Sequence, residues 1–112
     1  MAIPKVNANL CDQPPNAPTG LAATSSGGQL TLTWTAPSPA DPDSWDSIQG
    51  YRIYRWPSSR GVQFPGDRYQ FVGTSNSYAD TSPDPGGVTQ SYCVTAVDTH
   101  LNESPCSPVV TG

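Results

Sequence analysis

Basic residues are scarce in this sequence of 112 residues. Lysine and arginine together number 5, aspartate and glutamate number 9, and the net charge is −4. So few cations cannot line a phosphate backbone, and a negative net charge repels one, so the composition excludes a nucleic-acid partner. The sequence also lacks an apolar run near the roughly 20 residues of a membrane-spanning helix, and we expect no membrane partner.

Side chains that commonly carry chemistry are equally few. His100 is the single histidine, no Gly-x-Ser-x-Gly segment occurs, and no two of the 3 cysteines form a Cys-x-x-Cys pair. A serine or cysteine nucleophile needs a neighbouring base, and a zinc site needs closely spaced nitrogen and sulfur ligands. The sequence therefore predicts a protein that is not an enzyme and has no cofactor.

Long helical segments are also missing, because 13 prolines and 10 glycines interrupt the chain. Both residue types end helices and form turns. Residues 90–98 alternate instead, with Tyr92, Val94 and Ala96 on one face of a strand and Cys93 and Thr95 on the other. We interpret the first face as buried and the second as solvated. A sheet with one apolar face needs a second layer, so the chain is predicted to be one all-β sandwich.

The same alternation predicts the other strands of the sandwich. Trp34, Tyr51 and Ile53 should share one core with the buried face of residues 90–98, whereas Arg52, Tyr54 and Trp56 should form an outer stripe. The predicted strands are 19–25, 29–35, 50–56, 68–74, 77–80, 90–98 and 106–111.

Several of these segments resemble a fibronectin type III domain of the bacterial or bacteriophage type. The resemblance rests on Pro18-Thr19-Gly20-Leu21, Leu30-Thr31-Leu32-Thr33-Trp34, Gly50-Tyr51-Arg52-Ile53-Tyr54-Arg55 and Tyr92-x-Val94-x-Ala96-Val97-Asp98 followed by Asn102-Glu103-Ser104. It implies an immunoglobulin-like, seven-stranded sandwich. One sheet would hold strands 19–25, 29–35 and 77–80, and the other would hold the remaining four. The resemblance implies no catalysis.

Residues 1–17 precede the sandwich of residues 18–112 as an extended, proline-rich N-terminal arm. Prolines disfavour a helix here, and the sizeable apolar side chains of the arm are Ile3, Val6 and Leu10. We expect these three to bind a partner, the alternative being that they pack on their own domain. The first residues contain no apolar signal-peptide core. Two interpretations stay open: a small complete protein that is not exported by the general secretory route, or a domain of a secreted parent.

Aromatic side chains near the predicted outer stripe form a second candidate binding surface. Aromatics beside Arg52 and Arg68 could anchor a partner protein or stack on a surface glycan. The alternative is that the long loops cover them. The candidate residues are Tyr54, Trp56, Trp45 and Phe64.

Acidic side chains would gather at one end of the implied topology. Calcium binds six to eight oxygen ligands, which two loops could supply. Asp and Asn are also ordinary turn formers, so turn capping is the competing interpretation. The calcium candidates are Asp41, Asp43, Asp46, Asp98, Asn102 and Glu103.

The implied topology also suggests a disulfide bond between Cys11 and Cys106. Cys106 would begin the last predicted strand, at the end of the sandwich where the first strand begins. Cys11 shortly precedes that first strand in the sequence. Continued antiparallel pairing would put Cys106 opposite about Val97, roughly 13 Å along the strand from Cys93. The alternative is three free thiols in a reducing cytoplasm.

Two functions are compatible with these features. The first is a non-catalytic structural or binding protein of a larger assembly, such as a bacteriophage capsid decoration or tail accessory protein. Such a protein would lie on the virion surface and contact a capsid protein, a tail protein or further copies of itself. The second is an accessory, spacer or carbohydrate-binding module of a secreted bacterial polysaccharide-degrading enzyme or surface protein.

Overall fold

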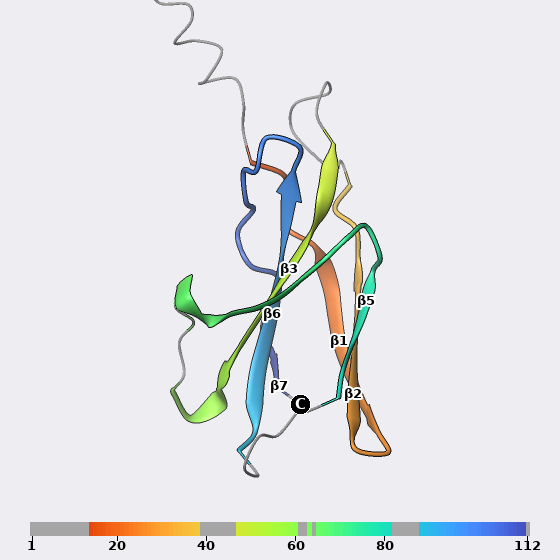
Figure 1. Ribbon diagram of the computed structural model, residues 1–112, viewed down its shortest axis with the longest axis vertical. Helices are drawn as coiled ribbons and strands as arrows, with labels where there is room; N and C mark the ends of the chain where they lie inside the picture. Colours follow the sequence, from red (N-terminus) through yellow and green to blue (C-terminus); the bar gives the residue numbers. More distant parts are fainter. Residues whose placement is uncertain (1–13, 39–46, 61–62, 64, 82–87, 112) are drawn as a thin grey trace, which may run out of the picture.

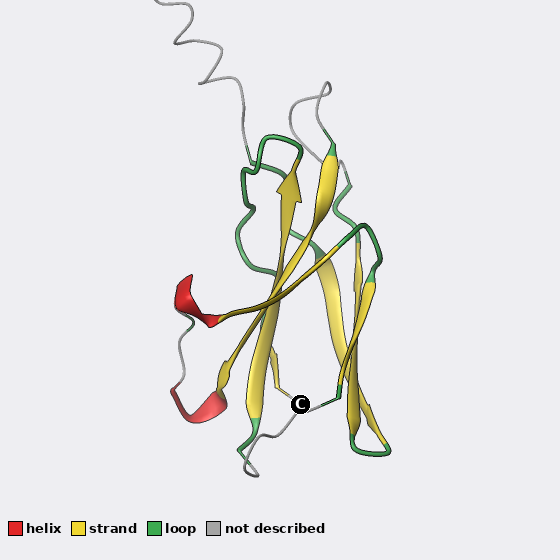
Figure 2. Ribbon diagram, viewed as in Figure 1, coloured by secondary structure: helices red, strands yellow, loops and turns green. Residues whose placement is uncertain are grey.

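The computed structural model describes residues 14–38, 47–60, 63, 65–81 and 88–111. Seven strands form two antiparallel sheets that face each other (Figures 1 and 2). One sheet has the order β1-β2-β5, from β1 (Thr19–Ser26), β2 (Gln29–Thr35) and β5 (Ser77–Asp80). The other has the order β4-β3-β6-β7, from β4 (Arg68–Val72), β3 (Ile48–Pro57), β6 (Gln90–Asp98) and β7 (Val110–Thr111). Two short 3-10 helices, η1 (Ser58–Arg60) and η2 (Pro65–Asp67), lie between β3 and β4. The predicted all-β sandwich and its division into two sheets are confirmed.

The core between the sheets contains the side chains that alternation assigned to it. Trp34 and Tyr51 pack edge to face with ring centroids 5.4 Å apart. The indole N–H of Trp34 has no hydrogen-bond partner among the described residues. The buried core comprises Leu21, Leu30, Leu32, Trp34, Tyr51, Ile53, Tyr92, Val94 and Ala96. All six residues predicted to share one core therefore do so.

A buried carboxylate joins the two sheets at one edge. Asp80, which is fully buried on β5, accepts hydrogen bonds from Tyr92 Oη at 2.7 Å and Tyr69 Oη at 3.0 Å. It also pairs with Arg55 Nη1 at 3.0 Å, and this guanidinium lies 3.8 Å from the Tyr69 ring centroid. Burial and the hydrogen bond to Asp80 raise the pKa of Tyr69 to about 12 and also raise that of Tyr92. Strand β5 is thereby fixed to β3, β4 and β6 of the other sheet.

The prediction that one face of β6 is solvated is wrong, because all nine residues of β6 are buried. The chain after β6 returns along the strand and covers it. Ser104 and Ser107 donate their backbone N–H groups to the carbonyls of Ala96 and Val94, at 2.8 and 2.9 Å. Their hydroxyls in turn accept the N–H groups of the same two residues. The proline after each serine lacks an N–H, so regular pairing resumes only at β7. This explains why the predicted strand 106–111 is shorter in the structure.

No helix among the residues described above is long and apolar enough to cross a membrane. The boundary between residues 1–17 and 18–112 stays a prediction. Within the described part of that stretch, Pro15 and Pro18 are buried.

Candidate functional site

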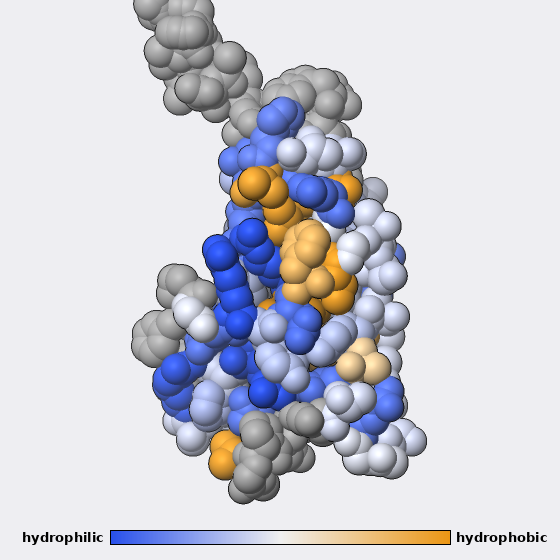
Figure 3. All heavy atoms as spheres, viewed as in Figure 1, coloured by the Kyte–Doolittle hydropathy of each residue, from blue (hydrophilic) through white to orange (hydrophobic). Residues whose placement is uncertain are grey.

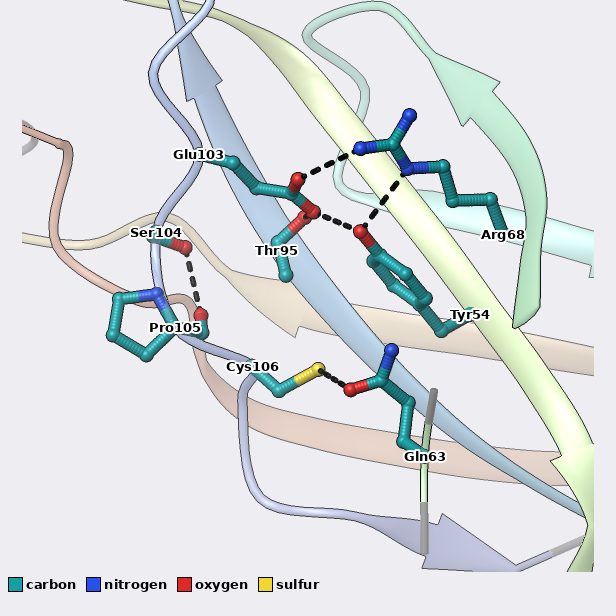
Figure 4. Close-up of a pocket in the computed structure, with 8 residues that line it drawn as sticks. All are labelled: Tyr54, Gln63, Arg68, Thr95, Glu103, Ser104, Pro105 and Cys106. Atoms are coloured by element: carbon teal, nitrogen blue, oxygen red, sulfur yellow. Dashed lines mark hydrogen bonds and ion pairs between the residues drawn. The ribbon is translucent and has the colours of Figure 1, made fainter. Parts of the chain in front are cut away.

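The outer face of the four-stranded sheet points away from β1, β2 and β5 and contains a polar cluster. Arg52 and Tyr54 of β3 lie opposite Thr95 and Cys93 of β6, so their side chains share this face. Glu103, which bridges to Val97 of β6, projects into the same region (Figure 4). We call Arg52, Tyr54, Arg68, Thr95 and Glu103 the outer-face cluster.

Glu103 is the centre of the outer-face cluster. Its carboxylate pairs with Arg52 Nη1 at 2.8 Å and Arg68 Nη2 at 3.5 Å. It also accepts hydrogen bonds from Thr95 Oγ1 at 2.6 Å and from the Tyr54 hydroxyl. Several charge-assisted hydrogen bonds on one carboxylate fix its position far better than a single surface ion pair can. The loop after β6 is therefore attached to β3, β4 and β6.

The contacts within the cluster change the acidity of its members. Burial by itself raises the pKa of Glu103, but hydrogen bonds from Thr95 and Tyr54 and the charge of Arg52 outweigh it and lower the pKa. Burial and the hydrogen bond to Glu103 raise the pKa of Tyr54. At neutral pH the cluster therefore holds an ionised carboxylate and a neutral phenol.

A disulfide bond between Cys93 and Cys106 lies beside the cluster, with a Cα–Cα distance of 5.7 Å. The predicted Cys11–Cys106 bond is therefore wrong; Cys11 itself lies outside the described residues. The error was one of register. Glu103, not Cys106, lies opposite Val97, so the returning chain is three residues, or about 10 Å, further along β6 than predicted. This shift brings Cys106 to Cys93.

Tyr54 and Trp56 are not exposed binding residues, which corrects their predicted role. Their exposed fractions are 4% and 3%, and both pack against Cys93 and the partly buried Cys106. The alternative interpretation expected the long loops to cover these aromatic side chains. They are covered, but by the chain that returns along β6. The other predicted partner-binding residues, Ile3, Val6, Leu10, Trp45 and Phe64, lie outside the described residues.

A pocket of about 300 Å³ opens beside the cluster and the disulfide bond (Figure 4). Gln63 lies on one side, with its Oε1 atom 4.0 Å from Cys106 Sγ. The polar groups of Glu103, Thr95 and Tyr54 bond to one another, and the sulfur of Cys106 is held in the disulfide. This arrangement suits a structural role. The lining residues are Tyr54, Gln63, Arg68, Thr95, Glu103, Ser104, Pro105 and Cys106.

The described calcium candidates are occupied by other contacts. Asp98 is fully buried and accepts the backbone N–H groups of His100 and Asn102, each at 2.9 Å, and the Asn102 side-chain amide at 3.1 Å. These bonds cap the turn that holds Leu101 at a φ of 67°. Glu103 points at Arg52 instead.

Within the described ranges, no group of three or more His, Cys, Asp or Glu residues is arranged to hold a metal ion. Asp41, Asp43 and Asp46 lie outside the described residues. Calcium binding stays a prediction that the described contacts do not support.

Sequence reasoning missed two features of this sheet. Glu103 was assigned to calcium, although Arg52 on the predicted outer stripe was a candidate ion-pair partner. The exposed edge formed by β4 was also missed. There, Phe71 is 52% exposed beside Arg68 and Gln70 in a shallow hollow of about 160 Å³.

No protein-family model matches the chain, and no curated protein matches it. Solved structures do match. The third fibronectin III domain of the human KIAA0343 protein is 20% identical, with a TM-score of 0.60 over 90% of this chain and 82% of that one. A β-1,2-glucanase from Parabacteroides distasonis is 28% identical, with a TM-score of 0.56 over 88% of this chain and 12% of that one. Pectate lyase PelI from Erwinia chrysanthemi is 17% identical, with a TM-score of 0.58 over 81% of this chain and 27% of that one.

The chain therefore has a fibronectin type III-like fold. It spans only 12% and 27% of the lengths of the two enzymes that it matches. The expected bacterial or bacteriophage type is not decided by these likenesses.

Proposed function

We propose that the chain is a non-catalytic structural and binding module of a larger assembly that works outside the reducing cytoplasm. The Cys93–Cys106 disulfide bond carries this proposal. Disulfide bonds persist in secreted proteins and on cell and virion surfaces, whereas cytosolic thiols are kept reduced. The neighbouring carboxylate, hydroxyl and guanidinium groups are engaged with one another, as expected for a module that presents a rigid surface.

Two settings fit this class, each with its own support. Enzyme-associated likenesses favour an accessory module of a secreted bacterial polysaccharide-acting enzyme, since the glucanase and the pectate lyase each contain a similar sandwich. The burial of Tyr54 and Trp56 removes two of the four aromatic residues predicted to stack on a glycan, so a spacer role is favoured over carbohydrate binding in this setting.

The second setting is the surface of a bacteriophage virion, as a capsid decoration or tail accessory protein. The proline-rich sequence of residues 1–17 supports it, because an extended arm can reach a neighbouring subunit. Fibronectin type III domains generally mediate contacts between proteins, which suits either setting.

Fractionation of the native source tests this proposal. An antibody against the chain would be used on virion, culture-supernatant and cytoplasmic fractions, with thiols alkylated before lysis. Sedimentation with virions supports the second setting, and recovery within a larger secreted polysaccharide-degrading protein supports the first. Recovery only as a free cytoplasmic protein with three alkylated thiols contradicts the proposal, as does cleavage of a polysaccharide by the purified chain.

A further inference from the structure

Strand β4 forms one open edge of the four-stranded sheet. It pairs with β3 on one side, and no strand among the described residues pairs with its other side. An edge strand leaves alternate N–H and C=O groups unpaired, and these can accept another strand. The other three sheet edges are less suited to accept an added strand. Strand β7 has only two residues, β1 lies against β7, and β5 has four residues and ends in the buried Asp80.

The side chains at the end of β4 also leave this part of the edge open. Natural edge strands are commonly protected by lysine, proline or inward-pointing charges. In β4 the charged Arg68 and an irregular register beside it protect the first part of the strand. The last three residues, Gln70, Phe71 and Val72, contain no charge and no proline. Figure 3 shows apolar surface near the middle of the view, where Figure 1 draws β4 crossing in front of β3. Phe71 is the largest exposed hydrophobic side chain among the described residues.

The shape of β3 beneath Phe71 supports this exposed position. A Cβ atom built on Gly50 would lie 2.5 Å from Phe71 Cζ and 2.6 Å from the Val72 carbonyl oxygen. Only glycine therefore lets the Phe71 ring lie against the backbone of β3. The ring is held in place at the edge and half exposed, as a contact for an added strand requires.

The arm contains a segment with the pattern of such a strand. In residues 5–10, Val6, Ala8 and Leu10 alternate with Lys5, Asn7 and Asn9. Alternation with a period of two is typical of a strand that has one apolar face. Six residues in a strand span about 20 Å, which suffices to cover the five residues of β4.

The receiving edge is assigned to a second copy of the chain, because a strand added to β4 of the same copy would not join the chain to an assembly. Strand β1 lies against β7, and Asp80 of β5 bonds to Tyr69 of β4, so β1 and β4 lie at opposite edges of the sandwich. A strand added to β4 of its own copy would leave the protein monomeric at every concentration, so the mass in solution distinguishes the two arrangements.

We propose that residues 5–10 of one copy add as an eighth strand along β4 of a second copy, with their apolar side chains beside Phe71. The inference rests on the proposed role in a larger assembly and names the surface through which copies join. Strand addition of this kind obtains affinity from backbone hydrogen bonds and specificity from alternate side chains. A reciprocal exchange gives a closed dimer, and a one-way exchange gives a chain of copies.

Sedimentation of purified protein tests this arrangement. Every sample carries Cys11→Ser, so that no dimer can arise from a Cys11–Cys11 bond. At concentrations up to about 1 mM, we expect a mass of at least twice the 11.8 kDa of one chain. Ala8→Pro in the arm, which removes a strand N–H, and Phe71→Glu on β4 should each weaken association at least about tenfold.

Mixing the two variants distinguishes strand exchange from other contacts. Each variant alone should associate at least about tenfold more weakly than the wild-type chain. The mixture should form a heterodimer, because one variant keeps its β4 edge and the other its arm. Val109→Glu is the matched control, since Val109 is 54% exposed elsewhere and its replacement should change nothing.

A wild-type chain that stays monomeric throughout contradicts the proposal, as does a Phe71→Glu variant that associates normally. An equal mixture with no heterodimer contradicts it as well. A monomeric chain found on virions or within a secreted parent would leave the proposed function intact, so the two failures are distinguishable.

Discussion

The two faces of β3 and β6 are both buried, but by different means. The inner face packs Tyr51, Ile53 and Val94 against the opposite sheet. The outer face is covered by the chain after β6, which is held there by Glu103 and the Cys93–Cys106 bond. The inner face is therefore stabilised by apolar burial, which is non-directional, whereas the outer face depends on directional contacts and one covalent bond. The contribution of the inner face to stability should fall when side-chain volume is lost. The contribution of the outer face should depend on redox state and pH.

Loss of volume on the inner face should have the largest effect. Trp34→Ala should lower the free energy of unfolding by about 3–5 kcal/mol, because it removes a large buried ring. Urea denaturation measures this change. Trp34→Phe is the matched control. It keeps an aromatic ring and removes an unpaired buried N–H, so it should be clearly milder. A loss below about 1 kcal/mol for Trp34→Ala would show that Trp34 is not a core residue.

Reduction of the disulfide bond should have the next largest effect on the free energy of unfolding. The bond joins residues 13 positions apart, and a loop of this size is worth about 3 kcal/mol in the chain-entropy model. The oxidised and reduced forms of one sample should differ in urea midpoint, and a Cys93→Ala/Cys106→Ala variant should show no redox dependence. Equal midpoints for the oxidised and reduced wild-type chain would contradict a role for this bond in stability.

Substitution of Gly50 should have a smaller effect on stability, and it tests how β4 packs against β3. Gly50→Ala should cost about 1–3 kcal/mol, because its methyl group meets the fixed carbonyl of Val72 as well as the Phe71 ring. Gly73→Ala is the control, since no atom lies within 4 Å of a Cβ placed there. Thermal unfolding of both variants makes the comparison, and equal melting temperatures would show that Phe71 does not lie over Gly50.

How far the sequence predicts each face follows from the same comparison. Alternation within residues 90–98 and 29–35 identifies which side chains share a face, so the core was predictable from Trp34 to Ala96. What covers the second face depends on the register of a loop, and alternation carries no such information. A shift of three residues at Glu103 changed the partner of Cys106 and buried Tyr54 and Trp56.

Substitution of Glu103 should have the smallest effect on the free energy of unfolding at neutral pH, and this effect should depend on pH. Because its folded pKa lies below its ordinary value of 4.5, its contribution is present above that pH and is lost as pH falls through the folded pKa. Glu103→Gln should cost about 1–2 kcal/mol at pH 7, and the difference from wild type should shrink in acid.

Asp67→Asn is the comparison for Glu103→Gln. Asp67 pairs with Arg60, whose side chain is 35% exposed, so this ion pair should contribute less. Denaturation at several pH values measures the two differences. A difference for Glu103→Gln that stays constant down to about pH 2 would contradict the ion-paired position of this carboxylate.

Peptide mapping without reduction tests the covered outer face most directly. Trypsin separates Cys11 from Cys93 at Arg68, and a glutamate-specific protease separates Cys93 from Cys106 at Glu103, the single glutamate of the sequence. After native alkylation, denaturation and digestion with both proteases, we expect fragment 69–103 to remain joined to fragment 104–112, with Cys11 alkylated. A Cys11–Cys106 linkage, or three alkylated cysteines, would contradict the account.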